Sequence, residues 1–224
     1  MTIAIIAALP EEADAFLPGQ GEAARLAYLP LRRIIAGGRD VVVATTGIGK
    51  VNTASAAALL HGAFAPELFL EIGTCGKLGA IQGDCFWLAS AVQHDYGAEE
   101  PGRFVHYDAG AWPIGEASIT PYSAIADPGV GLPHARIASG DAFIACPDQA
   151  RFLVEGLSAD VVDMETGALA QFCLQAGTSW AGIKATTDDA NHHSAGDFHA
   201  NLRAASARAA EAAERLLALL RWRL

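Results

Sequence analysis

Residues 40–60, DVVVATTGIGKVNTASAAALL, decide the class of fold. The first part, Asp40–Thr46, is short, apolar and rich in β-branched residues, which is typical of a buried strand. Gly47 and Gly49 follow, and the Ala-rich stretch Val51–Leu60 favours a helix that packs closely on a sheet. A strand that passes through a glycine loop into a helix indicates an α/β protein.

The alternation of strand and helix continues on both sides of this stretch. Further strands are predicted at Ile3–Ala8, Leu31–Ala36, Leu68–Ile72, Phe86–Val92, Arg136–Ser139, Asp160–Asp163 and Trp180–Ala185. Further helices are predicted at Thr166–Gln175 and at the amphipathic stretch Phe198–Leu220. Gly37-Gly38 predicts a hairpin turn, and the glycines, prolines and aromatic residues of 96–133 predict long loops. We therefore expect helices packed on a mainly parallel or mixed sheet.

Composition and charge narrow the function. The chain has 224 residues, 52% of them hydrophobic and 18% charged, so it can bury a full core, and we expect one domain over residues 1–224. Its net charge is −10 with only 15 Lys and Arg, whereas binding to nucleic acid or an anionic membrane needs a basic surface. We expect a small-molecule partner, and neither nucleic acid nor membrane.

The cysteines Cys75, Cys85, Cys146 and Cys173 are widely spaced and contain no C-x-x-C pair. They are predicted to be small buried residues in a reducing compartment, and not a disulfide frame or a zinc site. No basic segment precedes the apolar residues 3–9, and no stretch approaches the roughly 20 apolar residues of a transmembrane helix. We expect a cytoplasmic protein.

The glycine loop at residues 46–52 lies where a phosphate-binding loop would lie, yet it matches neither common type. A P-loop needs Gly at Ala44 and Ser or Thr at Val51, and the dinucleotide-binding fingerprint needs Gly at Asn52. The loop is either a cradle for another ligand or a plain turn, and the same alternatives apply to the second cluster, Gly73–Gly76.

Acidic residues follow three of the predicted strands. Glu12 follows the first strand, Asp163 and Glu165 follow Ala159–Val162, and Asp188 follows Trp180–Ala185. In open α/β sheets ligands bind beyond the carboxyl ends of strands, and general acid–base chemistry needs two carboxyls in different environments. Each of these residues alone is also consistent with a helix cap or a surface charge.

Several motifs together resemble one family. These are TTGIGKVNTASAA, GTCGKLG, SGDAFI, VVDMETGALAQ and KATTDDAN, preceded by Ile3–Ile6 and Glu11-Glu12. They resemble the nucleoside phosphorylase/hydrolase superfamily over nearly the whole chain, and within it most of all the 5'-methylthioadenosine/S-adenosylhomocysteine nucleosidases. The resemblance implies a three-layer α/β/α sandwich with a central mixed sheet, a homodimer and a nucleoside substrate, with no cofactor and no metal.

The resemblance also implies roles for single residues. Asp188 would protonate N7 of the purine, Glu12 would activate the attacking water, and Glu165 would bind the ribose 2'- and 3'-hydroxyls. Met164 would pack against the sugar and Thr74 would lie beside sugar and base. The remaining implied contacts are Phe143 stacking on adenine, Ile144 binding it through its backbone, and Asp163, which replaces a usual Glu, near the ribose.

These roles suit the chemistry of glycosidic cleavage. A purine anion is a poor leaving group, so an acid must protonate it as the bond breaks. Positive charge develops on the ribose, where a nearby carboxylate stabilises it, and a second carboxylate takes the proton of water.

The same superfamily also uses phosphate in place of water. Phosphorylases keep an Arg before the glycine turn, in the form Arg-Val-Gly-Ser, whereas this chain has Glu71 there, and a carboxylate is expected to repel phosphate. Arg25, Arg32 and Arg33 are predicted to lie in a surface loop and a hairpin edge. We therefore expect hydrolysis. The alternatives are a relative that cleaves futalosine or a hopanoid nucleoside, a purine nucleoside phosphorylase, or a protein that binds nucleosides without cleaving them.

Two further groups stand out in the sequence. His94, His192 and His193 are each consistent with a structural role or a place beside the site, and metal binding is disfavoured because ligands at the right spacing are lacking. Exposed aromatic residues in the 96–121 stretch are predicted to suit a partner subunit, namely Phe104, Tyr107 and Trp112, together with Pro113.

Overall fold

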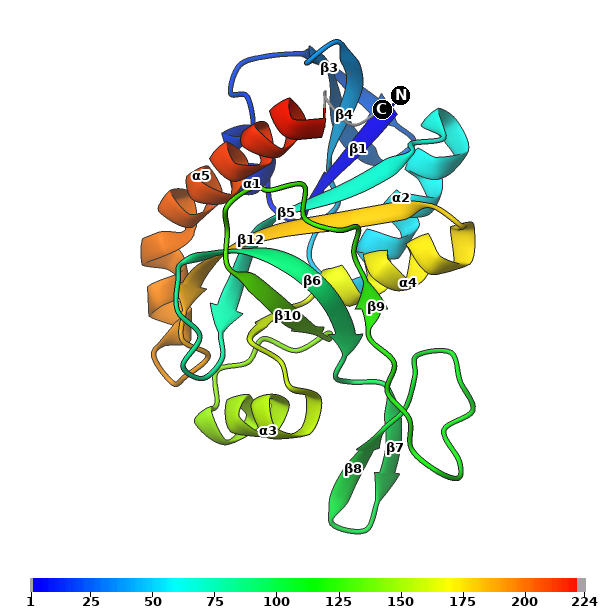
Figure 1. Cartoon of the computed structure of the whole chain (residues 1–224), viewed down its shortest axis with the longest axis vertical. Coiled ribbons are helices and arrows are strands. Elements are labelled where there is room, and N and C mark those ends of the chain that lie inside the picture. The colour runs from blue at the N-terminus through cyan, green and yellow to red at the C-terminus, as the bar shows by residue number, and fades with distance from the viewer. Residues whose placement is uncertain (1, 221–224) are drawn as a thin grey trace.

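The computed structural model describes residues 2–220 and forms a mixed sheet of ten strands (Figure 1). The strand order is β11-β10-β6-β12-β5-β1-β4-β3-β2, with β9 paired to β6. The strands are β1 Thr2–Ala7, β2 Glu22–Leu26, β3 Leu29–Ala36, β4 Arg39–Thr45, β5 Leu68–Lys77, β6 Cys85–Gln93, β9 Tyr122–Ser123, β10 His134–Ser139, β11 Val161–Asp163 and β12 Ser179–Asp188.

Helices cover both faces of the sheet (Figure 1). On one face, α1 (Pro10–Ala15) and α5 (Ser194–Leu220) pack against an apolar cluster that contains Ile5 and Leu70. On the other face, α2 (Lys50–Phe64) and α4 (Thr166–Ala176) pack against a second cluster. The predicted three-layer α/β/α sandwich with a mixed sheet is confirmed.

The direction of the strands decides where the functional residues meet. β1, β5 and β12 are mutually parallel, so their carboxyl ends lie at one edge of the sheet. β11 runs parallel to β10 but antiparallel to the end of β5, where Val161 and Val162 pair with Lys77 and Gly76. Because β11 pairs with both β10 and β5, the residues after it return to the same edge.

Most of the predicted elements are present. The hairpin turn at Gly37-Gly38 joins β3 and β4, and both glycines have the positive φ angles, 62° and 76°, that such a turn requires. α4 ends at Gly177, as its left-handed φ of 66° allows.

The prediction of long loops over 96–133 was wrong in part, because this segment contains β9 and the hairpin β7 (Gly97–Glu100) and β8 (Arg103–His106). The hairpin projects from the body of the protein at the lower end of Figure 1. The short helix α1, the strand β2 and the helix α3 (Pro147–Leu157) were not predicted either.

The cysteines depart from the prediction of uniform burial. All four are free, and Cys75 and Cys173 are buried, but Cys85 is half-buried and Cys146 is exposed. None of the helices in the described part of the chain is long and apolar enough to cross a membrane.

Candidate active site

A cavity of about 400 Å³ lies at the carboxyl ends of β1, β5, β11 and β12. It is lined by seven of the eight residues that the sequence singles out: Glu12, Thr74, Phe143, Asp163, Met164, Glu165 and Asp188. The eighth, Ile144, is buried in a separate apolar cluster with Leu78 and Leu153. Its side chain does not line the cavity, and the predicted contact concerned only its backbone.

Glu12 is buried and firmly held. Its Oε1 accepts hydrogen bonds from the backbone N–H of Thr74 at 2.8 Å and from the Thr74 hydroxyl at 2.9 Å, and its Oε2 accepts one from the N–H of Leu9 at 3.0 Å. A Cβ at Gly73 would lie 2.7 Å from Glu12 Oε1, so only glycine allows this approach. Gly73 of β5 therefore leaves the space that the Glu12 carboxylate occupies.

Asp188 is the last residue of β12 and is also buried. Its Oδ2 accepts a hydrogen bond from the Thr187 hydroxyl at 2.8 Å, and its Oδ1 accepts one from the N–H of Ala190 at 3.0 Å. These contacts fix the orientation of the carboxyl at the cavity wall. Thr187 is a supporting residue that the sequence analysis missed.

Glu165 lies at the start of α4 and is held by the glycine loop. Its Oε1 accepts a hydrogen bond from the N–H of Gly49 at 2.9 Å, and Asp141 Oδ1 accepts one from the N–H of Lys50 at 2.8 Å. The amino end of α2, which is a typical anion site, is therefore filled by two carboxylates of the protein itself. Burial raises the pKa of Glu165 to about 7, although Lys184 acts against this rise.

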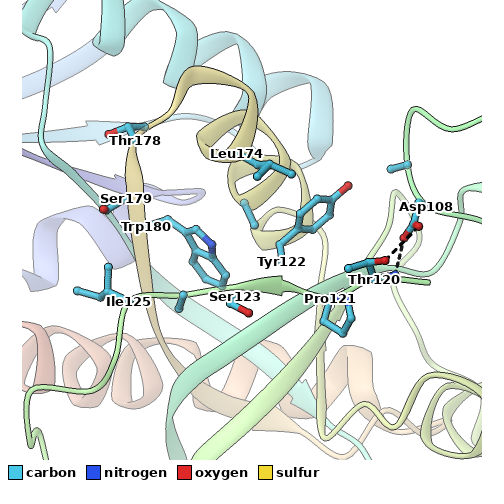
Figure 2. Close-up of a pocket in the computed structure, with 13 residues that line it drawn as sticks. Asp108, Thr120, Pro121, Tyr122, Ser123, Ile125, Leu174, Thr178, Ser179 and Trp180 are labelled. Carbon is cyan, nitrogen blue, oxygen red and sulfur yellow. Dashed lines mark hydrogen bonds between the residues drawn. The ribbon is translucent and has the colours of Figure 1, made fainter. Parts of the chain in front are cut away.

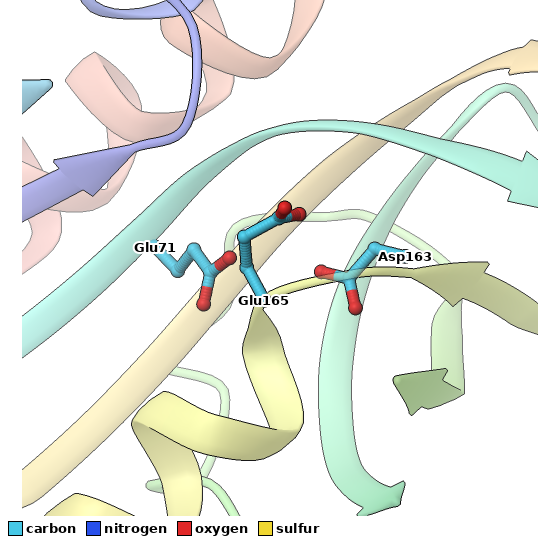
Figure 3. A group of neighbouring side chains, drawn as sticks. All are labelled: Glu71, Asp163 and Glu165. Atoms are coloured by element: carbon cyan, nitrogen blue, oxygen red, sulfur yellow. The ribbon is translucent and has the colours of Figure 1, made fainter. Parts of the chain in front are cut away.

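Lys184, in the middle of β12, was not predicted as part of the site. Its side chain is only 1% exposed, and its Nζ lies 2.9 Å from Glu71 Oε1, 3.0 Å from Asp163 Oδ2 and 3.9 Å from Glu165 Oε2. Figure 3 shows these three carboxylates close together. Carboxylates so close could hold a metal ion, but here the Lys184 ammonium already contacts all three.

Asp163 lines the cavity as well, and its carboxylate has several partners within the protein. Its carboxylate accepts hydrogen bonds from the hydroxyls of Ser139 and Thr166 and pairs with Lys184. Burial alone would raise the pKa of Asp163, but Lys184 and these hydroxyls hold it below its usual range. These partners hold the ionised Asp163 carboxylate firmly at the cavity wall.

Glu71 was expected to repel phosphate from the site, but the structure places its side chain outside the cavity lining. It is 1% exposed, is not among the residues that line the cavity, and pairs with Lys184. Burial raises the pKa of Glu71 to about 8, against the opposing effect of Lys184, and its Oε2 has no hydrogen-bond partner among the described residues. The Glu71 carboxyl is therefore largely protonated at neutral pH and presents no negative charge to the cavity.

The opposite wall of the cavity is apolar and aromatic. Phe143 is 48% exposed and meets Phe198 of α5 edge to face, with ring centroids 6.1 Å apart. Ile48 and Met164 extend this wall, and His199 adds a polar group. Phe198 was missed as a site residue because the sequence shows it only as the start of an amphipathic helix.

The remaining residues singled out by the sequence lie outside the cavity. His94 is buried, and its carbonyl oxygen lies 2.7 Å from His106 Nε2, while His192 and His193 are exposed. Tyr107 was predicted to be exposed but is buried, with its hydroxyl donating to the carbonyl of Gly115. Trp112 is 77% exposed, whereas Phe104 and Pro113 are half-buried.

A second cavity of about 640 Å³ lies at the other end of β12, beside Ser179 and Trp180 (Figure 2). Among the described residues that line it, Asp108 is the one carboxylate. Both Asp108 oxygens accept hydrogen bonds, Oδ1 from the N–H of Thr120 and Oδ2 from its hydroxyl. This cavity is larger but offers no pair of carboxyls for acid–base chemistry.

The fold and the carboxylate-lined cavity agree with a family match. Residues 2–218 match the Phosphorylase superfamily, and the chain belongs to this superfamily. A 5'-methylthioadenosine/S-adenosylhomocysteine nucleosidase of Shewanella halifaxensis is 31% identical over 170 residues, which cover 72% of this chain and 74% of the relative. A nucleosidase of the same name from Mycobacterium bovis is 29% identical over 251 residues, which cover 98% of this chain and 98% of the relative.

Solved structures show the same fold. The 5'-methylthioadenosine/S-adenosylhomocysteine nucleosidase of Helicobacter pylori, in complex with a substituted pyrrolidin-3-ol, superposes with a TM-score of 0.86 at 21% identity, covering 97% of this chain and 98% of that one. A futalosine hydrolase mutant of the same organism gives a TM-score of 0.85 at 21% identity, covering 97% and 99%. At these identities the likeness extends to the fold alone.

Proposed function

We propose that this protein is a nucleosidase that hydrolyses the N-glycosidic bond of an adenine nucleoside carrying an apolar or thioether 5' group, such as methylthioadenosine or adenosylhomocysteine. The observation that carries the proposal is that Glu12, Glu165 and Asp188, from three separate parts of the chain, line one cavity. The relatives near 30% identity bear the name of this activity.

In this proposal the reaction divides between two ends of the cavity. Asp188 donates a proton to N7, so that the base leaves neutral. Glu12 takes a proton from the water that attacks C1', and its three hydrogen bonds hold it in place for this step. Glu165 accepts hydrogen bonds from the ribose hydroxyls and stabilises the positive charge that develops on the sugar.

The apolar wall accounts for the proposed substrate class. The rings of Phe143 and Phe198 suit a purine plane, because aromatic rings gain from stacked and edge contacts. Met164 and Ile48 offer an adaptable apolar surface for the sugar and its 5' substituent. A futalosine-type or hopanoid substrate is the second candidate, supported by the fold shared with futalosine hydrolase.

Water, not phosphate, is the proposed nucleophile, because a dianion needs cationic donors. No Arg or Lys is among the described residues that line the cavity. The Arg32 guanidinium donates to the backbone carbonyls of Ala13 and Gln20 and so braces the loop after α1. The amino end of α2 already holds Glu165 and Asp141.

One chromatographic experiment tests this function. Purified protein is incubated with methylthioadenosine, adenosylhomocysteine, futalosine or inosine, each with and without inorganic phosphate. We expect free adenine and a free thioribose sugar from the first two nucleosides, at a rate that phosphate does not change. A sugar 1-phosphate product would move the chain to the phosphorylases, and tight binding without cleavage would make it a nucleoside-binding protein.

We further propose a cytoplasmic homodimer whose interface includes the 96–121 segment. Trp112 and Ile114 are 77% and 70% exposed there, and exposed aromatic and aliphatic side chains are typical of interface cores. Light scattering over a range of concentrations tests the dimer. A monomer mass at every concentration would refute it.

A further inference from the structure

Lys184 is the feature of this site that the proposed reaction leaves unexplained. It is fully buried, contributes no atom to the cavity wall, and contacts Glu71, Asp163 and Glu165. Taking an ammonium out of water costs several kcal/mol, and its partners must compensate for that cost. A core built only for stability would gain more from apolar residues at these positions, so the cluster calls for a functional explanation.

The three carboxyl groups around Lys184 differ in their partners and in their charge. Asp163 is the ionised partner of Lys184, with hydroxyl donors of its own on Ser139 and Thr166. Glu71 Oε2 has no donor among the described residues, which suits a carboxyl that keeps its proton. Asp163 and Glu165 both reach the ammonium and line the cavity, but the Asp163 carboxylate is already engaged by Lys184 and two hydroxyls, which leaves Glu165 to bind the substrate.

We infer that Lys184 is a positioning residue of the nucleosidase: through space, it keeps the Glu165 carboxylate ionised so that this carboxylate can accept hydrogen bonds from the ribose hydroxyls. The inference rests on the proposed function. At 3.9 Å the ammonium is too far from Glu165 Oε2 for a short hydrogen bond, so the effect is electrostatic. An ionised carboxylate can accept hydrogen bonds with both of its oxygens. A protonated carboxyl carries an O–H donor on one oxygen, and this donor needs an acceptor of its own.

The groups around Glu165 determine whether loss of Lys184 raises or lowers the pKa of this carboxyl. Burial raises its pKa to about 7, Lys184 lowers it, and Asp163 and Glu12 raise it again. The ionisable groups that face Lys184 or Glu165 are Glu12 on α1, Glu71 and Cys75 on β5, Asp163 on β11, Asp188 on β12 and, beyond Asp163, His94 after β6. Without the ammonium the carboxylates dominate, and Glu165 becomes protonated at neutral pH.

The test compares Lys184→Met with Lys184→Arg and with the control Lys77→Met, which removes a lysine paired at the surface with Asp84. The activity of each variant on methylthioadenosine and on its 2',3'-dideoxy analogue is followed from pH 5 to 9. For Lys184→Met we expect the acid limb of kcat/KM to move upward by about one pH unit or more, which is about a fivefold loss or more at pH 7 because the pKa of Glu165 starts at about 7. The loss should appear mainly in KM.

Two further results are expected. Lys184→Arg restores the acid limb because it restores the charge. Cleavage of the dideoxy analogue depends much less on residue 184, because this analogue has no hydroxyls for Glu165 to bind and only the effect of Glu165 on the charge of the sugar remains. Lys77→Met behaves as the unmodified protein. Where Lys184→Met does not fold, the double variant Lys184→Met with Asp163→Asn replaces the ion pair by neutral groups of similar size and is measured in the same way.

Failure of the inference differs from failure of the proposed function. If the unmodified protein releases no base from any nucleoside, the proposed function is wrong. If it is active but a folded Lys184→Met variant keeps the same acid limb, or loses the same factor on both substrates, then Lys184 has only a structural role and the inference is wrong.

Discussion

The two cavities at the ends of β12 differ in chemistry more than in size. The larger one, beside Trp180, has about 640 Å³ and a single carboxylate whose oxygens are already hydrogen-bonded. The smaller one, beside Asp188, has about 400 Å³ and four carboxyl groups from α1, β11, the start of α4 and β12. The difference teaches that convergent ionisable groups, not empty volume, mark the site of reaction.

Strand direction explains why the carboxyls gather at only one end. Parallel strands β1, β5 and β12 point their carboxyl ends the same way, and residues after these ends are free of the ladder and can turn toward a ligand. The other end of β12 lies beside β9 and the loop before it, where the Thr120 hydroxyl is already hydrogen-bonded to Asp108.

The largest effect expected at the smaller cavity is that of Asp188→Asn. Asparagine keeps the shape but cannot donate an acidic proton, so kcat should fall by about 10²–10⁴-fold while nucleoside binding persists. The measurements are adenine release and calorimetric binding. Asp189→Asn, at the exposed neighbouring position, is the control and should change little. Activity near that of the unmodified protein in Asp188→Asn would remove Asp188 from its proposed role.

Glu12→Gln should lower kcat by about 10²-fold, because an amide is a far weaker base than a carboxylate. The amide NH₂ would also face one of the N–H groups that Glu12 now accepts from, so a modest loss of thermal stability should accompany the change. Adenine release and a melting curve measure both effects. Glu11→Gln, at an exposed position on the same helix, serves as the control. Equal activity of the two variants would contradict the role of Glu12.

Glu71→Gln tests the buried cluster behind the smaller cavity through stability. Burial raises the pKa of Glu71 from 4.5 to about 8, so the unfolded chain releases this proton at lower pH than the folded chain does. The free energy of unfolding of the unmodified protein should therefore fall as pH rises from 4.5 to 8, by up to about 1.4 kcal/mol per pH unit from this group.

Glutamine has no proton to lose, so Glu71→Gln should be more stable than the unmodified protein at pH 8, by an amount of the order of a few kcal/mol, and closer to it at pH 5. Denaturant unfolding at a series of pH values measures this. The exposed Glu155→Gln on α3 should follow the unmodified protein throughout. Parallel stability curves for Glu71→Gln and the unmodified protein would show that Glu71 is ionised in the folded state.

The smallest effect is expected at the larger cavity. Tyr122→Phe removes a hydroxyl from its wall and should leave kcat/KM unchanged within about twofold, since changes away from functional groups are usually worth at most about 0.5 kcal/mol. The same adenine-release assay measures it. A tenfold loss would mean that the larger cavity takes part in the reaction, and that the two cavities do not differ in the way proposed.

Much of this arrangement could be predicted from local sequence. Apolar runs and glycine turns identify the strands, and the acidic residues after them identify Glu12, Glu165 and Asp188 as a group at one sheet edge. Those signals are local, because the carboxyl end of a parallel strand is recognisable without knowing which strands are its neighbours.

The rest depends on contacts between distant parts of the chain. Lys184 lies within an apolar strand, and only the pairing of β11 with β5 and of β5 with β12 brings Asp163 and Glu71 to it. The same contacts bury Glu71 and raise its pKa, which no neighbour in sequence indicates. Phe198 joins the site only through the packing of α5, and α1 is too short to give a periodic signal.

The Glu71–Lys184 pair constrains how this protein could change its reaction in evolution. An Arg at position 71, where the resemblance places the phosphate-binding Arg of phosphorylases, would put a second cation beside the Lys184 ammonium in a buried site, where like charges repel strongly. Loss of Lys184 alone leaves the ionised Asp163 carboxylate without its buried partner, which typically costs about 3–5 kcal/mol. The two positions therefore show epistasis: each single replacement destabilises the protein, and only the joint replacement of both residues avoids this loss. Melting temperatures of the two single variants and the double variant would measure how much stability each step loses.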